Sequence, residues 1–269
     1  MANHPLKYDI DYIEQGVVHF EDYIDASFYL IEGEEKAMLI DTGCGGGNVR
    51  RLAAAFTDKP MVLAVTHAHS DHDAHAKEFE TAYLHVADID RLEEMNRHFG
   101  VSEEEALHAQ DFVAIRAGDV IDLGNCPVRV FEMPGHTPGS VVFVDEKHRL
   151  VFTGDAIGSG VGVWMQLRGC PCLSQYRKDL EKLKTELEPY REYTFLGGHY
   201  RQGGTPGTPD YHPASYRMLE DLITLCDLVL SGEIKGTEYA PIGRFADDEV
   251  TLIASYGEAA LVYLPSYVK

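Results

Sequence analysis

The sequence His67-Ala68-His69-Ser70-Asp71-His72 places four potential metal ligands within six positions. It directly follows the apolar run 61–65, which predicts a buried strand. Imidazole nitrogens and carboxylate oxygens together suit zinc, iron or manganese better than calcium or magnesium. A strand that ends in such a loop fixes the backbone while the loop turns several side chains toward one point. The stretch therefore predicts a catalytic metal site.

Composition limits the classes of partner. The chain has 269 residues, of which 45% are apolar, and no run approaches the ~20 apolar residues that cross a bilayer. Residues 1–12 have no apolar core of the signal-peptide kind, so we expect a cytoplasmic protein with no membrane partner. The formal net charge of −21 disfavours nucleic acid and leaves a small-molecule substrate, which one local arginine could hold if it is anionic.

The five cysteines do not form a recognisable framework. Their number is odd and their spacings match neither a zinc knuckle nor a disulfide scaffold, which fits a reducing compartment. Cys170-Pro171-Cys172 is compatible with a metal pair, a redox pair or two loop thiols near a pocket. The sequence leaves these alternatives open, as it does the choice between monomer and homodimer.

Short β-branched runs alternate with amphipathic patterns along the chain. The expected strands are 16–20, 27–31, 36–41, 61–65, 81–85, 128–132, 140–145, 150–152, 194–196 and 250–263. The expected helices begin at 49, after the capping residue Asn48, and at 74, and cover 87–99, 103–109, 173–188 and 213–231. No repeat or disordered linker interrupts them. We expect one domain, 1–269, of sheets with helices outside and two similar halves, about 1–147 and 148–269.

Three later segments repeat the pattern of a strand that ends in a ligand-type residue. These are Met133-Pro134-Gly135-His136-Thr137-Pro138-Gly139, Val151-Phe152-Thr153-Gly154-Asp155 and Phe195-Leu196-Gly197-Gly198-His199. Each alone is compatible with an ordinary turn or a core histidine. Together with the first motif they supply five histidines and two aspartates on four strand ends, which is the inventory of a binuclear site.

The order H-x-H-x-D-H, P-G-H-T-P-G, T-G-D and G-H resembles the metallo-β-lactamase superfamily of metal-dependent hydrolases. The earlier Asp41-Thr42-Gly43 resembles the D-T-G segment of that superfamily. The likeness extends over about residues 15–200. It implies an α+β fold, a four-layer αββα sandwich of two mixed sheets flanked by helices, with two divalent metal ions, zinc before iron or manganese.

The resemblance also implies a role for each matching residue. His67, His69 and His136 would hold one metal, Asp71, His72 and His199 the other, and Asp155 would bridge them. Asp41 would orient ligand imidazoles. The metals would supply a hydroxide nucleophile, and Asp71 would act as the catalytic proton shuttle. His75 follows the first motif where many relatives have glycine, and its role stays open between a ligand and a surface helix position.

Substrate recognition is expected from the loops around the metals. Trp164 and Met165 offer an apolar wall, and Arg168 offers a cation for a carboxylate. Tyr200 directly follows His199 and offers a hydroxyl. A packing loop with a surface arginine is the alternative interpretation of residues 156–168.

The leading functional hypothesis is hydrolysis of a small ester, lactone, thioester or amide, with lactonase-like and glyoxalase-II-like chemistry ahead of a β-lactamase. The main alternative is an enzyme resembling the mononuclear-iron persulfide dioxygenases, which uses fewer of these ligands. A nuclease of the same superfamily is disfavoured by the acidic charge. A non-catalytic binding module is disfavoured because the chain keeps the full ligand set.

Overall fold

The computed structural model describes residues 8–158, 162–199, 214–239 and 249–269. Their internal contacts divide the chain into two compact units. Unit 1 comprises Met1–Val130 and Phe143–Leu150, and unit 2 comprises Phe131–Val142 and Val151–Lys269. The expectation of a single domain with halves meeting near residue 147 stays a prediction.

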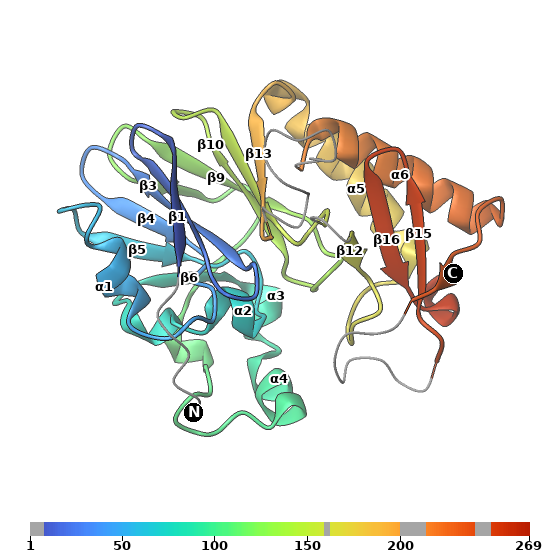
Figure 1. Ribbon diagram of the computed structural model, residues 1–269, viewed down its shortest axis with the longest axis horizontal. Coiled ribbons are helices and arrows are strands. Elements are labelled where there is room, and N and C mark those ends of the chain that lie inside the picture. Colours follow the sequence, from blue (N-terminus) through green and yellow to red (C-terminus); the bar gives the residue numbers. More distant parts are fainter. Residues whose placement is uncertain (1–7, 159–161, 200–213, 240–248) are drawn as a thin grey trace. The chain divides into compact units, whose positions relative to one another are not determined.

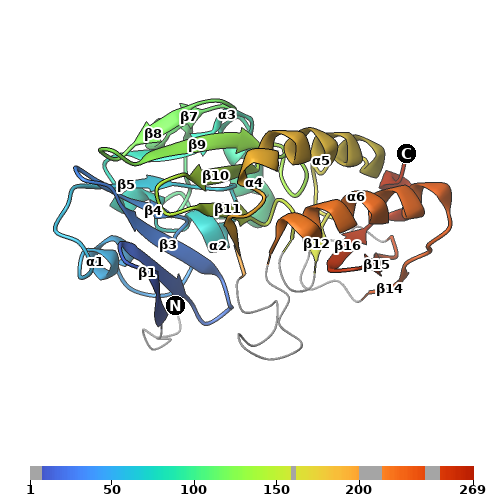
Figure 2. The ribbon, with the colours of Figure 1, turned by 90° about the horizontal axis from the view of Figure 1, so that it is seen from above.

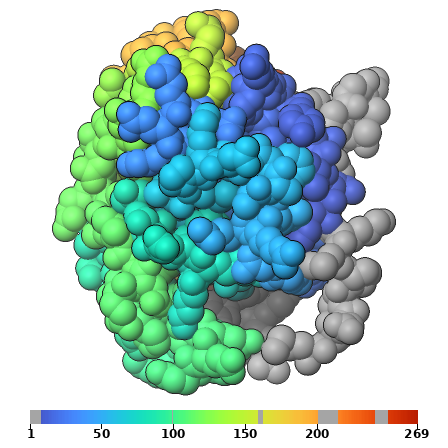
Figure 3. Space-filling view, turned by 90° about the vertical axis from the view of Figure 1, so that its left-hand side faces the viewer, coloured from blue at the N-terminus to red at the C-terminus, as the bar shows by residue number. Residues whose placement is uncertain are grey.

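Unit 1 contains a seven-stranded mixed sheet (Figure 1). Its strands, in spatial as well as sequence order, are β1 (Asp9–Glu14), β2 (Val17–Glu21), β3 (Ser27–Glu32), β4 (Ala37–Ile40), β5 (Met61–Ala64), β6 (Ala82–His85) and β7 (Val113–Ile115). β1 to β4 pair antiparallel, whereas β4 to β7 pair parallel. In Figure 3 the side chains of this unit, coloured blue to green, form much of the visible face.

The parallel register of β4 and β5 brings two distant motifs together. Ile40 pairs with Ala64, and the Asp41 amide donates to the Ala64 carbonyl at 3.0 Å. The carboxyl ends of parallel strands lie at the same sheet edge. Asp41 and the loop that begins at His67 therefore leave the sheet side by side.

The helices of unit 1 are short. They are α1 (Val49–Ala53), α2 (Ser70–Asp73), η1 (Ala76–Glu78), α3 (Val86–Ile89), α4 (Leu92–Phe99) and η2 (Ala109–Asp111). Asn48 caps α1 as predicted, since its side chain accepts the Arg51 amide at 2.6 Å. Apolar residues from these segments and from alternate strand positions form one core, in which Phe20 stacks on Phe28 with ring centroids 4.9 Å apart.

Three helix predictions in this region were wrong. In place of the helix expected to begin at 74, the structure has only the short 3₁₀ turn η1. The single helix expected at 87–99 is broken between α3 and α4. No α-helix forms at 103–109, of which only the last residue belongs to the short 3₁₀ turn η2, because the backbone groups near its end have other partners. The Asn96 side chain donates to the Leu107 carbonyl at 2.8 Å, and the His108 amide donates to the Asp111 carboxylate at 2.8 Å.

A second sheet carries the other three ligand-bearing segments. Its spatial order is β13-β11-β10-β9-β8. The strands are β8 (Val120–Asp122), β9 (Pro127–Glu132), β10 (Val141–Asp145), β11 (Leu150–Gly154) and β13 (Thr194–Gly197). β10 and β11 are buried along their whole length, which explains their largely apolar sequence. The segments after β9, β11 and β13 lead to His136, Asp155 and His199.

The C-terminal part of unit 2 forms a small third sheet of order β12-β16-β15-β14. Its strands are β12 (Val163–Trp164), β14 (Thr237–Glu238), β15 (Leu252–Tyr256) and β16 (Ala259–Tyr263). The single strand expected at 250–263 is instead a hairpin, in which Tyr256 pairs with Ala259 and Gly257 adopts a φ of 57°. A positive φ is readily available to glycine, so Gly257 permits the tight reversal.

Two long helices accompany this sheet. α5 (Leu173–Leu187) and α6 (Tyr216–Ser231) run side by side, and α6 packs against β15 and β16 (Figures 1 and 2). α6 begins at Ser215, whose hydroxyl accepts the Met218 amide at 2.9 Å. The short turns η3 (Glu188–Tyr190) and η5 (Pro265–Tyr267) complete the unit. Within the described ranges, no helix is both long and apolar enough to cross a membrane.

Two glycines with similar backbone angles permit a matched stability test. A Cβ on Gly257 would lie 2.1 Å from the Asp221 carboxylate, which accepts the Glu258 amide at 3.0 Å, whereas a Cβ on Gly232 (φ 79°) would meet no atom within 4 Å. Gly232→Ala should cost about 1–2 kcal/mol of unfolding free energy from backbone strain alone. Gly257→Ala should cost clearly more, because Asp221 must also move. Equal losses in urea unfolding would contradict this packing.

Candidate metal centre

Asp41 holds in place the loop of unit 1 that carries the candidate ligands of residues 67–72, called the ligand loop below. It is 2% exposed and adopts a φ of 61°, in the left-handed region. Its Oδ1 accepts the Thr66 amide at 2.7 Å, and its Oδ2 accepts the Thr66 hydroxyl at 2.7 Å and Nδ1 of His72 at 2.9 Å. The carboxylate thus ties the end of β4 to both sides of the histidine motif.

These hydrogen bonds assign the tautomers of two histidines. The Thr66 hydroxyl has one proton and gives it to Asp41, so the 3.1 Å contact with Nδ1 of His67 requires that His67 donate. His72 likewise donates from Nδ1 to Asp41. In the neutral form of each ring, the proton on Nδ1 leaves Nε2 as the atom with a lone pair, which is the form that binds a metal.

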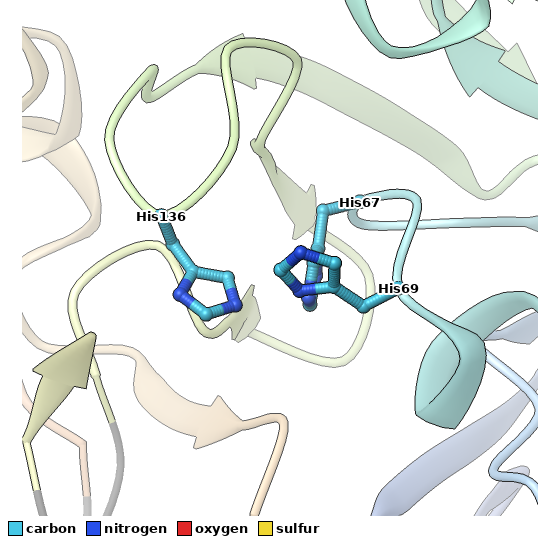
Figure 4. A group of neighbouring side chains, drawn as sticks. All are labelled: His67, His69 and His136. Carbon is cyan, nitrogen blue, oxygen red and sulfur yellow. The ribbon is translucent and has the colours of Figure 1, made fainter. Parts of the chain in front are cut away.

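The first motif is compact. The His67 and His69 rings meet edge to face with centroids 4.8 Å apart, and the His67 and His72 centroids are 4.2 Å apart. Figure 4 shows His67 and His69 on the loop that enters α2. Nε2 of His72 lies 3.5 Å from Oδ2 of Asp71. His67 and His72 are buried, whereas His69 and Asp71 keep partial exposure.

Unit 2 contributes a second set of ligand-type residues. His136, drawn in Figure 4 on the loop after β9, donates from Nδ1 to the Trp164 carbonyl at 3.0 Å. Its Nε2 lies 3.6 Å from Oδ2 of Asp155, and Nε2 of His199 lies 3.4 Å from the same oxygen. Two ligands of one tetrahedral zinc, each about 2.1 Å from it, are about 3.4 Å apart. Each of the two imidazoles is therefore spaced from Asp155 as two ligands of one cation would be.

The described residues contain groups of histidine and aspartate side chains that could hold a metal ion. The members that the sequence predicted are His67, His69, Asp71, His72, His136, Asp155 and His199. Asp41 is not a member, in keeping with its expected role of orienting an imidazole.

His75, whose role the sequence left open, has protein partners on both ring nitrogens. Nδ1 lies 3.0 Å from the Glu78 carboxylate and Nε2 lies 2.9 Å from the Gly45 carbonyl. Because a carbonyl oxygen only accepts, Nε2 of His75 is a donor here and has no lone pair for a metal. His75 fastens the loop around Gly45.

A further group lies in unit 1, where Cys126, directly before β9, meets Asp145 and His148 of the segment that leads from β10 to β11. Oδ1 of Asp145 accepts the amides of Lys147 and His148 at 2.9 and 3.1 Å, and Oδ2 lies 2.5 Å from Nδ1 of His148. Burial and the neighbouring Asp145 raise the pKa of Cys126 to about 12, so the thiol stays protonated. This group is explained as a hydrogen-bonded turn.

The residues expected to contact substrate have different surroundings. Trp164 is half-buried, Met165 is 2% exposed and Arg168 is exposed. Tyr200 lies outside the described residues. Two supports were missed from the sequence: Thr66, which connects Asp41 with His67, and the Trp164 carbonyl, which holds His136. Thr66 is signalled only by its position between the strand and the first histidine, and a backbone carbonyl leaves no sequence signal.

Comparisons with known proteins match this chain to a family and to individual relatives. The family model described as the metallo-beta-lactamase superfamily matches residues 24–225. The acyl-coenzyme A thioesterase MBLAC2 of Bos taurus is 28% identical over 210 residues, covering 66% of this chain and 74% of its own. The hydroxyacylglutathione hydrolase GloC of Haemophilus influenzae is 25% identical over 182 residues, covering 62% of this chain and 82% of its own.

Solved structures establish the fold. The DIM-1 metallo-beta-lactamase superposes with a TM-score of 0.62 at 16% identity, covering 83% of this chain and 98% of its own. A metallo-beta-lactamase family protein from Thermus thermophilus superposes with a TM-score of 0.56 at 19% identity, covering 82% of each chain. The predicted α+β class with an αββα sandwich is confirmed by these likenesses.

Asp41→Asn tests the support of the ligand loop. Asparagine keeps the shape, but its NH₂ group cannot accept a hydrogen bond. Either the Thr66 amide or both the Thr66 hydroxyl and Nδ1 of His72 therefore lose their acceptor. Outer partners of this kind are typically worth about 10- to 100-fold in metal affinity. We expect that loss for zinc in chelator competition. His75→Ala is the control, and an affinity loss as large for His75→Ala as for Asp41→Asn would contradict the assignment.

Proposed function

Because the chain belongs to the metallo-beta-lactamase superfamily, we propose that it is a binuclear metal-dependent hydrolase that cleaves thioesters of anionic carriers. The metal-dependent hydrolase class itself follows from the superfamily and from its hydrolase relatives. The number of metals, the nucleophile and the substrate are the proposed parts. The observation that carries the metal site is the spacing of the imidazoles around Asp155, whereas the substrate class is inferred from the relatives.

The proposed ligand sets divide the seven residues between two metals. The first set is His67, His69 and His136, the second is Asp71, His72 and His199, and Asp155 serves both. Support comes from the fixed rings, since His67, His72 and His136 each have Nδ1 engaged by a protein oxygen. The 3.4 and 3.6 Å distances from Asp155 to His199 and His136, and the 3.5 Å distance from Asp71 to His72, support it further.

When bound, two divalent cations, zinc before iron or manganese, supply a deprotonated water near neutral pH and a positive charge for the carbonyl oxygen. The protein's own groups arrange the remaining steps. The side chain of Asp71 is 27% exposed, so it can exchange protons with solvent. It would take the proton of the attacking water and return it to the departing sulfur. The water oxygen bonds to the carbonyl carbon as the C–S bond breaks, and the thiol leaves with the proton from Asp71. The acid gives its remaining proton to solvent and leaves as a carboxylate.

The thioester class is chosen from two relatives. Acyl-coenzyme A and hydroxyacylglutathione, named in the matches to the bovine and Haemophilus proteins, are both thioesters of anionic carriers. In a chain of net charge −21, an exposed Arg168 offers a local cation for such a carrier. Trp164 supplies apolar surface for the acyl group, next to the buried Met165. Tyr200 stays a predicted hydrogen-bond donor.

The decisive experiment measures chelator-treated and zinc-reloaded protein against acyl-coenzyme A, acylglutathione, lactone and oxygen-ester substrates. We expect two zinc ions per chain, hydrolysis only after reloading, and the highest kcat/KM for a thioester. A protein purified with one iron per chain that consumes oxygen would contradict the proposal in favour of a dioxygenase. A higher kcat/KM for lactones would contradict the substrate class alone.

Asp155→Asn tests the shared ligand. The amide removes the negative charge between the two sets while nearly preserving volume, so we expect a loss of kcat/KM on the order of 100-fold or more, with less than two zinc ions retained per chain. Glu103→Gln neutralises a carboxylate that is 94% exposed and serves as the control. Full metal content and activity in Asp155→Asn would exclude Asp155 as a ligand.

Arg168→Ala tests carrier recognition. An exposed ion pair contributes about 0.2–1 kcal/mol, so KM for an anionic thioester should rise by up to about fivefold, with kcat unchanged. Hydrolysis of an uncharged thioester is the internal control and should not change. The difference between the two substrates should shrink in high salt. An equal effect on both substrates would assign Arg168 a structural role.

A further inference from the structure

The loop before α5 carries the thiol of Cys170, which contacts the carbonyl oxygen that orients the His136 ring. Sγ of Cys170 lies 3.4 Å from the His136 carbonyl and 3.7 Å from the Trp164 carbonyl. The Trp164 carbonyl is also the acceptor for Nδ1 of His136. The Cys170 thiol proton is therefore directed at the two main-chain oxygens around the His136 ring.

Cys172, two residues further on, is placed to ionise. It is the N-cap of α5, a 15-residue helix, and its Sγ lies 3.3 Å from the Ser174 hydroxyl. That hydroxyl, and next the Gln175 amide, lower the pKa of the Cys172 thiol. Helix N-termini and hydrogen-bond donors favour the thiolate.

The thiol pKa of three other cysteines is raised instead of lowered. Burial is the main cause that raises the pKa of Cys44, Cys126 and Cys226, each to about 12. Their thiols are therefore protonated at neutral pH. Cys170 and Cys172, by contrast, are both partly exposed to solvent.

The spacing of the two cysteines along the chain also allows a disulfide between them. Residues two positions apart span at most about 7 Å in a fully extended chain. Proline fixes its φ near −65°, which bends the segment at Pro171 and shortens that span. Disulfides accept Cα separations up to about 6.8 Å. The Cα separation that a disulfide requires therefore lies within the range open to this segment.

We propose that Cys170 and Cys172 are a redox modification site that forms a reversible disulfide across Pro171 when the protein meets a hydroperoxide. The Cys172 thiolate attacks the peroxide, the O–O bond breaks, and Cys172 becomes a sulfenic acid as hydroxide or alkoxide leaves. The Cys170 thiol then attacks that sulfur, the S–O bond breaks, and water leaves with the thiol proton. Two electrons pass from the sulfurs to the peroxide.

The disulfide removes the Cys170 proton from the His136 and Trp164 carbonyls. The ring of His136 then loses part of the support that orients it. We expect the oxidised protein to release zinc faster than the reduced protein. This second consequence rests on the proposed function, in which His136 is a metal ligand, whereas the disulfide itself does not.

The test treats the zinc-loaded full chain with hydrogen peroxide, alkylates remaining thiols and maps the peptides by mass spectrometry. We expect the peptide with Cys170 and Cys172 to lose two hydrogens and take up no alkylating agent, with full reversal by dithiothreitol. The rate should already be high at neutral pH, because the thiolate of Cys172 forms below the usual thiol pKa. Sulfinic acid at Cys172 beside an alkylated Cys170 would overturn the proposal.

Two variants separate the disulfide from its consequence. Ser174→Ala removes the hydroxyl that favours the thiolate, so peroxide should react with Cys172 several-fold more slowly at neutral pH. Cys172→Ser leaves Cys170 in place, so oxidation should no longer accelerate zinc release to a chelator. Equal release from reduced and oxidised wild-type protein would overturn the coupling. The peptide map that detects the disulfide requires no enzymatic assay. Its outcome is therefore independent of whether the protein hydrolyses thioesters.

Discussion

The carboxylate of Asp41 is the interaction on which the ligand loop of unit 1 depends. It holds Thr66 and His72 by three hydrogen bonds of 2.7–2.9 Å. The left-handed backbone at Asp41 costs roughly 1–2 kcal/mol, whereas each hydrogen bond to a charged group contributes about 1.5–3 kcal/mol. The bonds outweigh the strain, so the end of β4 keeps a conformation that no strand would adopt alone. The tautomers of His67 and His72 follow from it.

Much of the candidate site could be predicted because its residues are side chains at the ends of strands. The four ligand-bearing segments each follow a strand, as their apolar runs indicate. The errors have physical causes. Residues 103–109 have helical spacing, yet Asn96 and Asp111 take the backbone groups that a helix would use. The break at Gly257 depends on a turn that alternation of apolar residues does not encode.

The support of His136 could not be predicted for a different reason. Its acceptor is the carbonyl of Trp164, and any residue there would present the same atom. The sequence singled out Trp164 for its indole, as a wall for substrate. The structure adds a second role for the same residue, through the main chain. A tryptophan substitution therefore tests only the indole, whereas a change in the position of β12 tests the carbonyl.

That position is set by the C-terminal hairpin. β12 pairs parallel with β16, Trp164 opposite Val262, and the Met165 amide donates to the Val262 carbonyl at 2.7 Å. The family match ends at residue 225, so β16 lies beyond the part of the chain that resembles the whole superfamily. Sequence variation in this hairpin can move Trp164, and its carbonyl moves with it. Within unit 2, the position of the Trp164 side chain and the orientation of the His136 ring are therefore coupled through one backbone segment. A shift of β12 would change both, whereas a substitution of the indole alone would not.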